Sequence, residues 1–195
     1  MLKKVSKDDW QYLLPFLACS ICFIATDLFG LIEKTRFAYW SGGLLIEPYR
    51  IITTHFIHGD AKHLLANSFG IVVARYCLKC LRLQGKFFFL LLIGLLIPLQ
   101  TLLFWFIDIF IFRNPMSIAV GFSGILYGVD AFILLSSIYG KQRFIGLNIG
   151  LRKDHQIRQI ILVLTGVGFA WSLLPGISLL GHLAGCIAGA ALFLL

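Results

Sequence analysis

Two residues that lie far apart in the sequence have the chemistry of a nucleophile and its base. Ser123 lies in the Gly-Phe-Ser-Gly string of residues 121–124, and His182 lies in an apolar stretch near the end of the chain. A serine hydroxyl attacks a carbonyl when a neighbouring group takes its proton, and the two groups need to be neighbours in space rather than in sequence. The pair predicts acyl-transfer chemistry, with Ser123 as nucleophile and His182 as general base and acid.

A second group of polar residues has the chemistry to stabilise an oxyanion. His63 and Asn67 are four residues apart, so they share one face of a helix. Imidazole and amide N–H groups donate hydrogen bonds, and a backbone N–H at the start of a helix adds another donor. We expect His63, Asn67 and the backbone N–H of Ser123 to form an oxyanion hole.

Other hydrolytic chemistries lack the residues that they require. A zinc protease of the common type needs a His-Glu-x-x-His string, which the sequence does not contain. His55, His58 and His63 could bind a metal ion, but Asp60 is the single carboxylate near them. An aspartyl protease needs two aspartates in facing helices, and Asp130 has no clear partner. We therefore expect no metal and no cofactor.

The cysteines offer a rival interpretation as a zinc or redox site. Cys19 and Cys22 form one Cys-x-x-Cys pair, and Cys77 and Cys80 form another. Both pairs lie inside or at the end of apolar runs, with no histidine at ligand spacing beside them. We interpret these cysteines as small apolar packing residues.

The composition indicates that the elements holding these residues lie in a membrane. The chain has 195 residues, of which 59% are hydrophobic and 13% are charged. An average soluble domain has roughly 25% charged residues, and a soluble protein of this size could not bury so much apolar surface. The composition predicts an all-α polytopic membrane protein, and six spans of roughly 20 residues, about 120 residues in all, are close to the largest number that the chain can hold. The expected spans are 10–32, 51–83 with a helix over 63–78, 87–112, 117–140, 160–174 and 177–195.

The distribution of basic residues predicts the orientation of these spans. With both termini in the cytoplasm, the inside segments hold 12 lysines and arginines and the outside segments hold 5. This asymmetry follows the positive-inside rule, and it accounts for the net charge of +8 without a nucleic-acid partner. We expect residues 1–9 to form a cytoplasmic tail, residues 141–158 to form a cytoplasmic loop, and residues 10–195 to form one six-span domain.

Glycine spacing explains how the serine and the histidine could meet. Gly124 and Gly128 are four residues apart in the fourth span, and Gly185 and Gly189 are four residues apart in the sixth. Small residues at this spacing let helices approach closely in lipid. Packing these faces together would bring the nucleophile and the base together near the start of both helices. Tyr127, one turn after the serine, is positioned to stack on the imidazole.

Taken together, these residues resemble the rhomboid family of intramembrane serine proteases. Residues 58–67 fit the family's His-x4-His-x3-Asn signature, residues 121–128 fit Gly-x-Ser-Gly-x-x-Tyr-Gly, and residues 182–189 fit His-x-x-Gly-x3-Gly. Tyr49-Arg50 resembles the aromatic-arginine pair that ends the family's first loop. The resemblance covers most of the chain. One departure is Lys79, because after the second helix the family often carries a glutamate before a basic pair.

The resemblance implies a six-helix bundle that hydrolyses peptide bonds in or beside transmembrane segments. It implies a Ser123–His182 dyad without a third carboxylate, in which Tyr127 orients the histidine and Gly121 and His58 support the site. The implied partners are single-span membrane proteins in the lipid bilayer, with no nucleotide or nucleic acid. For a bacterial protein, the implied location is the plasma membrane.

Two other classes of function remain open at this point. A catalytically silent rhomboid-like binder is one, although such proteins usually lack the serine or the histidine, and Ser123 and His182 are both present. A small transporter is the other, but its polar residues would follow a path through the bilayer, whereas these cluster at one side. For a protease, we expect Gly121, Gly124, Gly128 and Tyr127 to line the site beside the serine and to favour a small residue at the cleaved bond.

Overall fold

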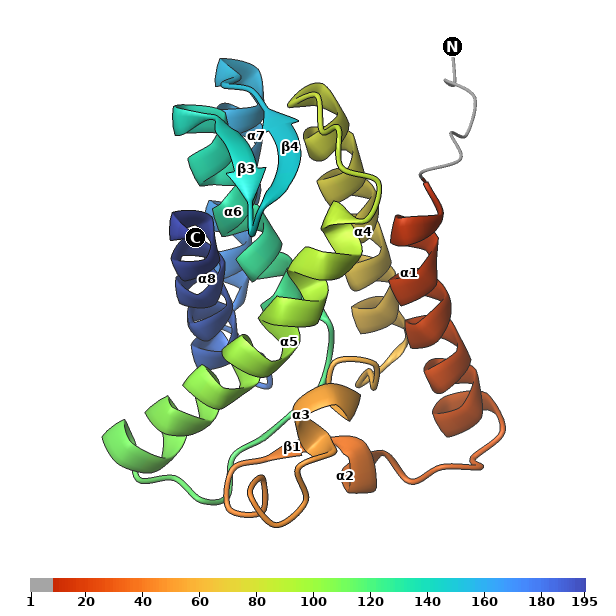
Figure 1. Cartoon of the computed structure of the whole chain (residues 1–195). Coiled ribbons are helices and arrows are strands. Elements are labelled where there is room, and N and C mark those ends of the chain that lie inside the picture. The colour runs from red at the N-terminus through yellow and green to blue at the C-terminus, as the bar shows by residue number, and fades with distance from the viewer. Residues whose placement is uncertain (1–8) are drawn as a thin grey trace.

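The computed structural model describes residues 9–195, which are mostly helical (Figure 1). Residues 1–8, which form most of the expected cytoplasmic tail, lie outside the described residues. The longer helices are α1 (Trp10–Phe23), α4 (Ala61–Cys80), α5 (Phe88–Phe106), α6 (Ser123–Tyr139), α7 (His155–Trp171) and α8 (Leu179–Leu194). The shorter elements are η1 (Ile24–Leu28), α2 (Lys34–Phe37), β1 (Tyr39–Trp40), α3 (Arg50–Thr53), η2 (Ile107–Ile111), β2 (Ile118–Ala119), β3 (Lys141–Phe144) and β4 (Leu147–Leu151).

The longer helices alternate in direction, so their ends gather at two sides of the molecule. In Figure 1, α1, α5 and α7 run downward, whereas α4, α6 and α8 run upward. The first residues of α4, α6 and α8 therefore lie at the lower ends of these helices, which point toward the side of the molecule where α2, β1 and α3 lie. The connection between α4 and α5 lies at the upper side. The start of β3, which follows α6, and the end of β4, which precedes α7, lie at the same side. Helix starts that carry His63, Ser123 and His182 thus face the same side of the bundle.

Two small two-stranded sheets accompany the mostly helical fold that the sequence predicts. β1 pairs with β2 in an antiparallel sheet that ties the connection after α1 to the connection before α6. β3 and β4 form an antiparallel hairpin in residues 141–151, where the sequence predicts a loop. The hairpin forms because Phe144, Ile149 and Leu151 are fully buried in the main hydrophobic core despite the basic residues around them.

Two helices, α6 and α7, begin five or six residues away from the expected start. The fourth expected span starts at residue 117, but α6 begins at Ser123 because residues 118–119 form strand β2. The fifth expected span starts at residue 160, but α7 begins at His155. Asp154 Oδ1 accepts a hydrogen bond from the Ile157 N–H at 3.0 Å and so caps this earlier start.

By length and composition, two helical segments of the described chain could cross a bilayer. They are Trp10–Leu28 and Phe88–Ile111, in which the π-helical turns η1 and η2 extend α1 and α5. α6 and α8 are apolar but shorter, with 17 and 16 residues. α4 has 20 residues but carries polar and basic side chains. These criteria therefore identify two spans rather than the six expected.

A buried carboxylate fixes the start of α1 to the far end of α4. Asp9 Oδ2 accepts a hydrogen bond from Arg75 Nη2 at 2.7 Å, and Asp9 Oδ1 accepts one from Arg75 Nε at 3.0 Å. Asp9 Oδ1 also lies 2.6 Å from Lys79 Nζ. The Asp9 side chain is 8% exposed, whereas its partners Arg75 and Lys79 remain partly exposed, at 31% and 41%. This contact gives Lys79, which departs from the family pattern, a structural role between two helices.

The glycine faces of α6 and α8 bring the two backbones into direct contact, as the spacing predicts. A Cβ atom added at Gly185 would collide with the carbonyl of Gly124, and one added at Gly189 would collide with the carbonyl of Gly128. Gln100 of α5 closes the contact at one end, because its Nε2 donates to the Gly181 carbonyl at 3.0 Å. The α6–α8 pair therefore has no room for side chains at these positions.

We expect Gly189→Ala to lower the stability of the folded protein. The new methyl group must displace the backbone of α6, and overpacking of this kind costs about 1–3 kcal/mol. Gly94→Ala on α5 is the matched control, because a Cβ atom there would meet nothing within 4 Å. Thermal unfolding in detergent micelles compares the two variants, and equal stabilities would contradict the packing argument.

Candidate active site

Ser123 and His182 meet at the starts of α6 and α8. His182 Nε2 lies 2.8 Å from Ser123 Oγ. Ser123 is the first residue of α6, and His182 lies in the first turn of α8, where Ser178 Oγ accepts a hydrogen bond from the Gly181 N–H at 3.1 Å. His182 is 7% exposed. The structure thus brings together the residues that the sequence predicts as nucleophile and base.

Tyr127 packs against the imidazole from the α6 side. Its ring is stacked on that of His182, with the ring centroids 4.3 Å apart and the planes inclined by 16°. The far end of Tyr127 reaches α7, where a Cβ atom added at Gly168 would collide with the phenol oxygen. The stacking expected from the one-turn spacing after Ser123 is therefore present, and Gly168 makes space for it.

The second nitrogen of the imidazole has a partner that the sequence analysis missed. Ser172, just after the last residue of α7, has its Oγ 2.6 Å from His182 Nδ1. Ser172 is 3% exposed, so this contact is buried. A hydroxyl residue at the end of an apolar helix, ten residues before His182, is a weak sequence signal. The contact depends on how α7 and α8 pack together.

Gly121 brings the predicted oxyanion donors close to the serine. Its φ of +115° is a conformation that suits glycine, and its N–H donates to the Thr54 carbonyl at 3.0 Å. A Cβ atom at Gly121 would lie 2.5 Å from His63 Nε2 and 3.4 Å from Asn67 Nδ2. His63 and Asn67 of α4 therefore converge on the backbone two residues before Ser123.

A hydrogen bond to His58 orients the Asn67 amide. His58 Nδ1 lies 3.2 Å from the Phe56 carbonyl, which can only accept, so Nδ1 carries the proton and Nε2 is an acceptor. Asn67 Nδ2 lies 2.8 Å from that acceptor and donates one of its two N–H groups to it. The second N–H stays available for another acceptor. His58 is fully buried and thus supports Asn67, as the sequence interpretation expects.

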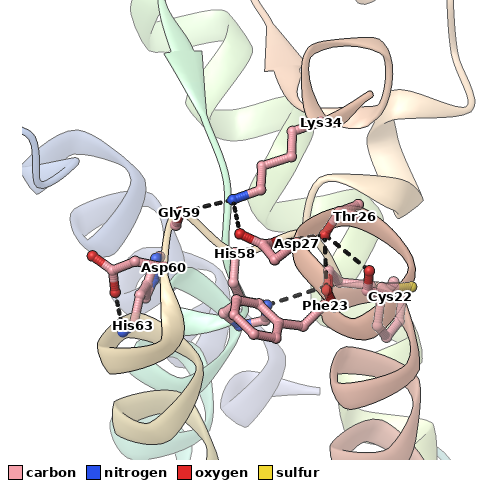
Figure 2. Close-up of polar contacts among 10 residues, drawn as sticks. Cys22, Phe23, Thr26, Asp27, Lys34, His58, Gly59, Asp60 and His63 are labelled. Carbon is pink, nitrogen blue, oxygen red and sulfur yellow. Dashed lines mark hydrogen bonds and ion pairs between the residues drawn. The ribbon is translucent and has the colours of Figure 1, made fainter. Parts of the chain in front are cut away.

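Polar contacts hold the chain before α4 against the end of α1 (Figure 2). The Lys34 ammonium donates to Asp27 Oδ1 at 2.6 Å and to the Gly59 carbonyl at 2.7 Å. Asp60 then caps α4, because its Oδ1 accepts a hydrogen bond from the His63 N–H at 2.8 Å. This hydrogen bond lowers the pKa of the Asp60 carboxyl below its ordinary value, so the cap, which is ionised at neutral pH, is also kept ionised further into the acid range than a free carboxyl. The first turn of α4, which carries His63, is fixed in this way.

Two of the four residues expected to line the site do not do so. Gly124 lies against Gln100 and Gly181, and Gly128 lies against Leu96 and the backbone of α8. These glycines face helix α8 because close helix packing uses their bare surface. The sequence interpretation assigned Gly124 and Gly128 both to helix packing and to the lining of the site. In the structure they serve helix packing, and Gly121 and Tyr127 lie beside the serine.

The described residues show no alternative metal site. No three side chains of His, Cys, Asp or Glu within residues 9–195 are grouped to hold a metal ion. His55 Nε2 instead lies 2.8 Å from Thr101 Oγ1 of α5. All five cysteines are free thiols. The side chains gathered at the site are those of two serines, three histidines, an asparagine and a tyrosine, namely Ser123, Ser172, His58, His63, His182, Asn67 and Tyr127.

Comparison with known proteins identifies the family. The model of the Rhomboid domain matches residues 46–195, which include every residue of the candidate site and more than half of the chain. No curated protein sequence matches the chain closely enough to identify a relative. Proteins of this family lie in membranes and act on transmembrane substrates within the bilayer. The chain therefore belongs to the rhomboid family.

Proposed function

We propose that this chain is an intramembrane serine endopeptidase that hydrolyses peptide bonds in or beside the transmembrane segments of other proteins. The observation that carries the proposal is the distance of 2.8 Å between His182 Nε2 and Ser123 Oγ. A base at this distance can take the hydroxyl proton during attack on a carbonyl. Membership of the rhomboid family supports the same class of reaction.

The reaction follows from the roles of the two residues. Ser123 Oγ attacks the substrate carbonyl carbon while its proton passes to His182 Nε2, giving a tetrahedral oxyanion. His182 then gives that proton to the leaving amine, the C–N bond breaks, and an acyl-enzyme remains. Water, losing its proton to the same imidazole, hydrolyses the ester and regenerates the Ser123 hydroxyl.

Donors for the oxyanion come from two helices. His63 and Asn67 of α4 both reach the Gly121 backbone. His58 accepts a hydrogen bond from one Asn67 N–H, so the second N–H is available to donate to an oxyanion. The Ser123 N–H belongs to the first turn of α6, where N–H groups have no acceptor within the helix. Donors fixed in advance act most strongly where charge develops. We therefore assign His63, Asn67 and the Ser123 backbone to the oxyanion hole.

The proposed arrangement in the membrane has six spans, formed by α1, α4, α5, α6, α7 and α8 within residues 10–195. The alternating helix directions in Figure 1 support it, because each pair of helices returns the chain to the same side. The upper connections include Arg82, Lys86, Arg152 and Lys153. By the positive-inside rule that side is cytoplasmic, as are both termini, and in a bacterium the membrane is the plasma membrane.

The proposed substrates are single-span membrane proteins cleaved near the outer face. The dyad lies toward the lower side in Figure 1, opposite the basic connections. Peptide bonds in a membrane helix are shielded by backbone hydrogen bonds that are costly to break in lipid. The enzyme should therefore prefer a segment that unwinds easily, with glycine, proline or polar residues inside the cleaved end.

Labelling with a fluorophosphonate tests the dyad, because the probe reports an activated serine without a transmembrane substrate. Detergent-solubilised wild-type protein should be labelled, whereas Ser123→Ala and His182→Ala should not. Against a single-span substrate, each variant should lose about 10⁴–10⁶-fold in kcat, and the double variant should be no worse. Ser137→Ala, a buried serine far along α6, is the control. A wild-type protein that neither labels nor cleaves would be a silent binder.

The oxyanion assignment predicts a graded loss of activity. Loss of one donor among several lowers kcat by up to about 10²–10³-fold. Asn67→Ala should cost less than this, because His63 and the Ser123 N–H remain as donors. His63→Ala should cost more than Asn67→Ala. His155→Ala, at an exposed position at the start of α7, serves as the matched histidine control. Full activity in both α4 variants would make the pair structural.

The topology predicts which introduced cysteines are accessible from outside intact cells. In a background without the native cysteines, Glu33→Cys should react with a membrane-impermeant maleimide, because it lies with α2 at the lower side. Gln142→Cys in the β3–β4 hairpin should react after the cells are lysed. Both positions are exposed, so burial does not explain a difference. The opposite labelling pattern would invert the proposed orientation.

A further inference from the structure

The imidazole of His182 is held at both of its nitrogens. Nε2 lies 2.8 Å from Ser123 Oγ, and Nδ1 lies 2.6 Å from Ser172 Oγ. Both Ser172 and His182 are buried, so water does not readily replace the contact between them. The sequence analysis assigns Tyr127 to orient the ring, but a stacked phenol does not determine which nitrogen carries the proton.

The hydrogen atoms at Ser172 can be counted. A serine hydroxyl has one hydrogen to donate and two lone pairs to accept. Ser172 Oγ also lies 2.7 Å from the Gly168 carbonyl, which can only accept. The Tyr127 hydroxyl is a further hydrogen-bond partner of Ser172 and can donate to its second lone pair. When the hydroxyl donates to Gly168, its contact with His182 must be one in which Nδ1–H donates and Oγ accepts. Nε2 then has its lone pair facing the Ser123 hydroxyl.

The opposite tautomer forms fewer hydrogen bonds and cannot react. In it, the Ser172 hydroxyl donates to His182 Nδ1, so its contact with the Gly168 carbonyl is lost. Nε2 then carries a hydrogen that faces Ser123 and cannot accept the hydroxyl proton. The buried chain of Gly168 carbonyl, Ser172 hydroxyl and imidazole therefore favours the tautomer that acts as a base.

We infer that Ser172 is a positioning residue that holds His182 in the tautomer protonated at Nδ1. This inference rests on the proposed function. The role corresponds to that of the carboxylate in a Ser-His-Asp triad, which fixes the imidazole tautomer and stabilises the imidazolium. When Nε2 takes the serine proton, the Nδ1–H bond to Ser172 becomes a charge-assisted bond and strengthens. The arrangement is thus a Ser-His-Ser chain that joins α6, α8 and the end of α7.

The test measures cleavage of a single-span substrate and the 15N spectrum of histidine-labelled protein. Ser172→Ala should lower kcat by about 10- to 100-fold with KM unchanged, because a hydrogen bond to a charged group is lost in the transition state. Ser172→Thr keeps the hydroxyl and should recover most of kcat. Ser137→Ala is the matched control, since both serines are 3% exposed and both donate to a helix carbonyl.

The 15N spectrum gives a result that a loss of packing would not. Signals of His182, assigned by their absence in His182→Ala, should show protonated Nδ1 in the wild type and a mixture of tautomers in Ser172→Ala. Wild-type kcat in Ser172→Ala would overturn the inference, as would a lower kcat with unchanged 15N shifts. If Ser172→Thr is also slow, the Ser172→Ala spectrum decides the question: a mixture of tautomers supports the inference, and unchanged 15N shifts overturn it. Failure of the proposed function would look different, because the wild type would then not react with the fluorophosphonate.

Discussion

The direct contact between the backbones of α6 and α8 is the constraint on which the rest of the structure depends. Gly185 and Gly189 lie against the carbonyls of Gly124 and Gly128, with no side chain between them. In lipid, helices associate through close packing and hydrogen bonds rather than through a hydrophobic effect between them. The same contact positions the dyad, because the serine and the histidine lie within one turn of it. Stability and chemistry thus share one interface.

α4 carries His63 and Asn67, the proposed oxyanion donors, and contacts near its two ends fix it to α1 and to the turn η1 that extends α1. Toward the last residue of α4, Asp9 pairs with Arg75 and Lys79. Before its first residue, Lys34 joins Asp27 of η1 to the Gly59 carbonyl. A helix held at two distant points neither slides nor rotates easily along its neighbour. The approach of its polar face to the Gly121 backbone is therefore set by contacts that lie outside the site.

The parts of the site that follow helical periodicity could be predicted from the sequence, and the parts that depend on tertiary packing could not. The spacing of Tyr127 from Ser123 determines the stacking on His182, because both residues lie on one short helix. Ser172 could not be predicted, since its position depends on how the turn between α7 and α8 folds back. The β3–β4 hairpin was missed because its charges indicate a loop, whereas the burial of Phe144 and its neighbours decides its structure.

Gly121 has a consequence for second-site suppression. A side chain there is disfavoured twice, by the positive φ and by the contact with His63. Truncating His63 would remove the collision with the new side chain but would leave the positive φ at residue 121. A substitution in the loop before α6 could change that φ but would leave the collision with His63. A single compensating substitution elsewhere therefore cannot restore a variant at this position. Genetic selections starting from such a variant should return true reversion to glycine.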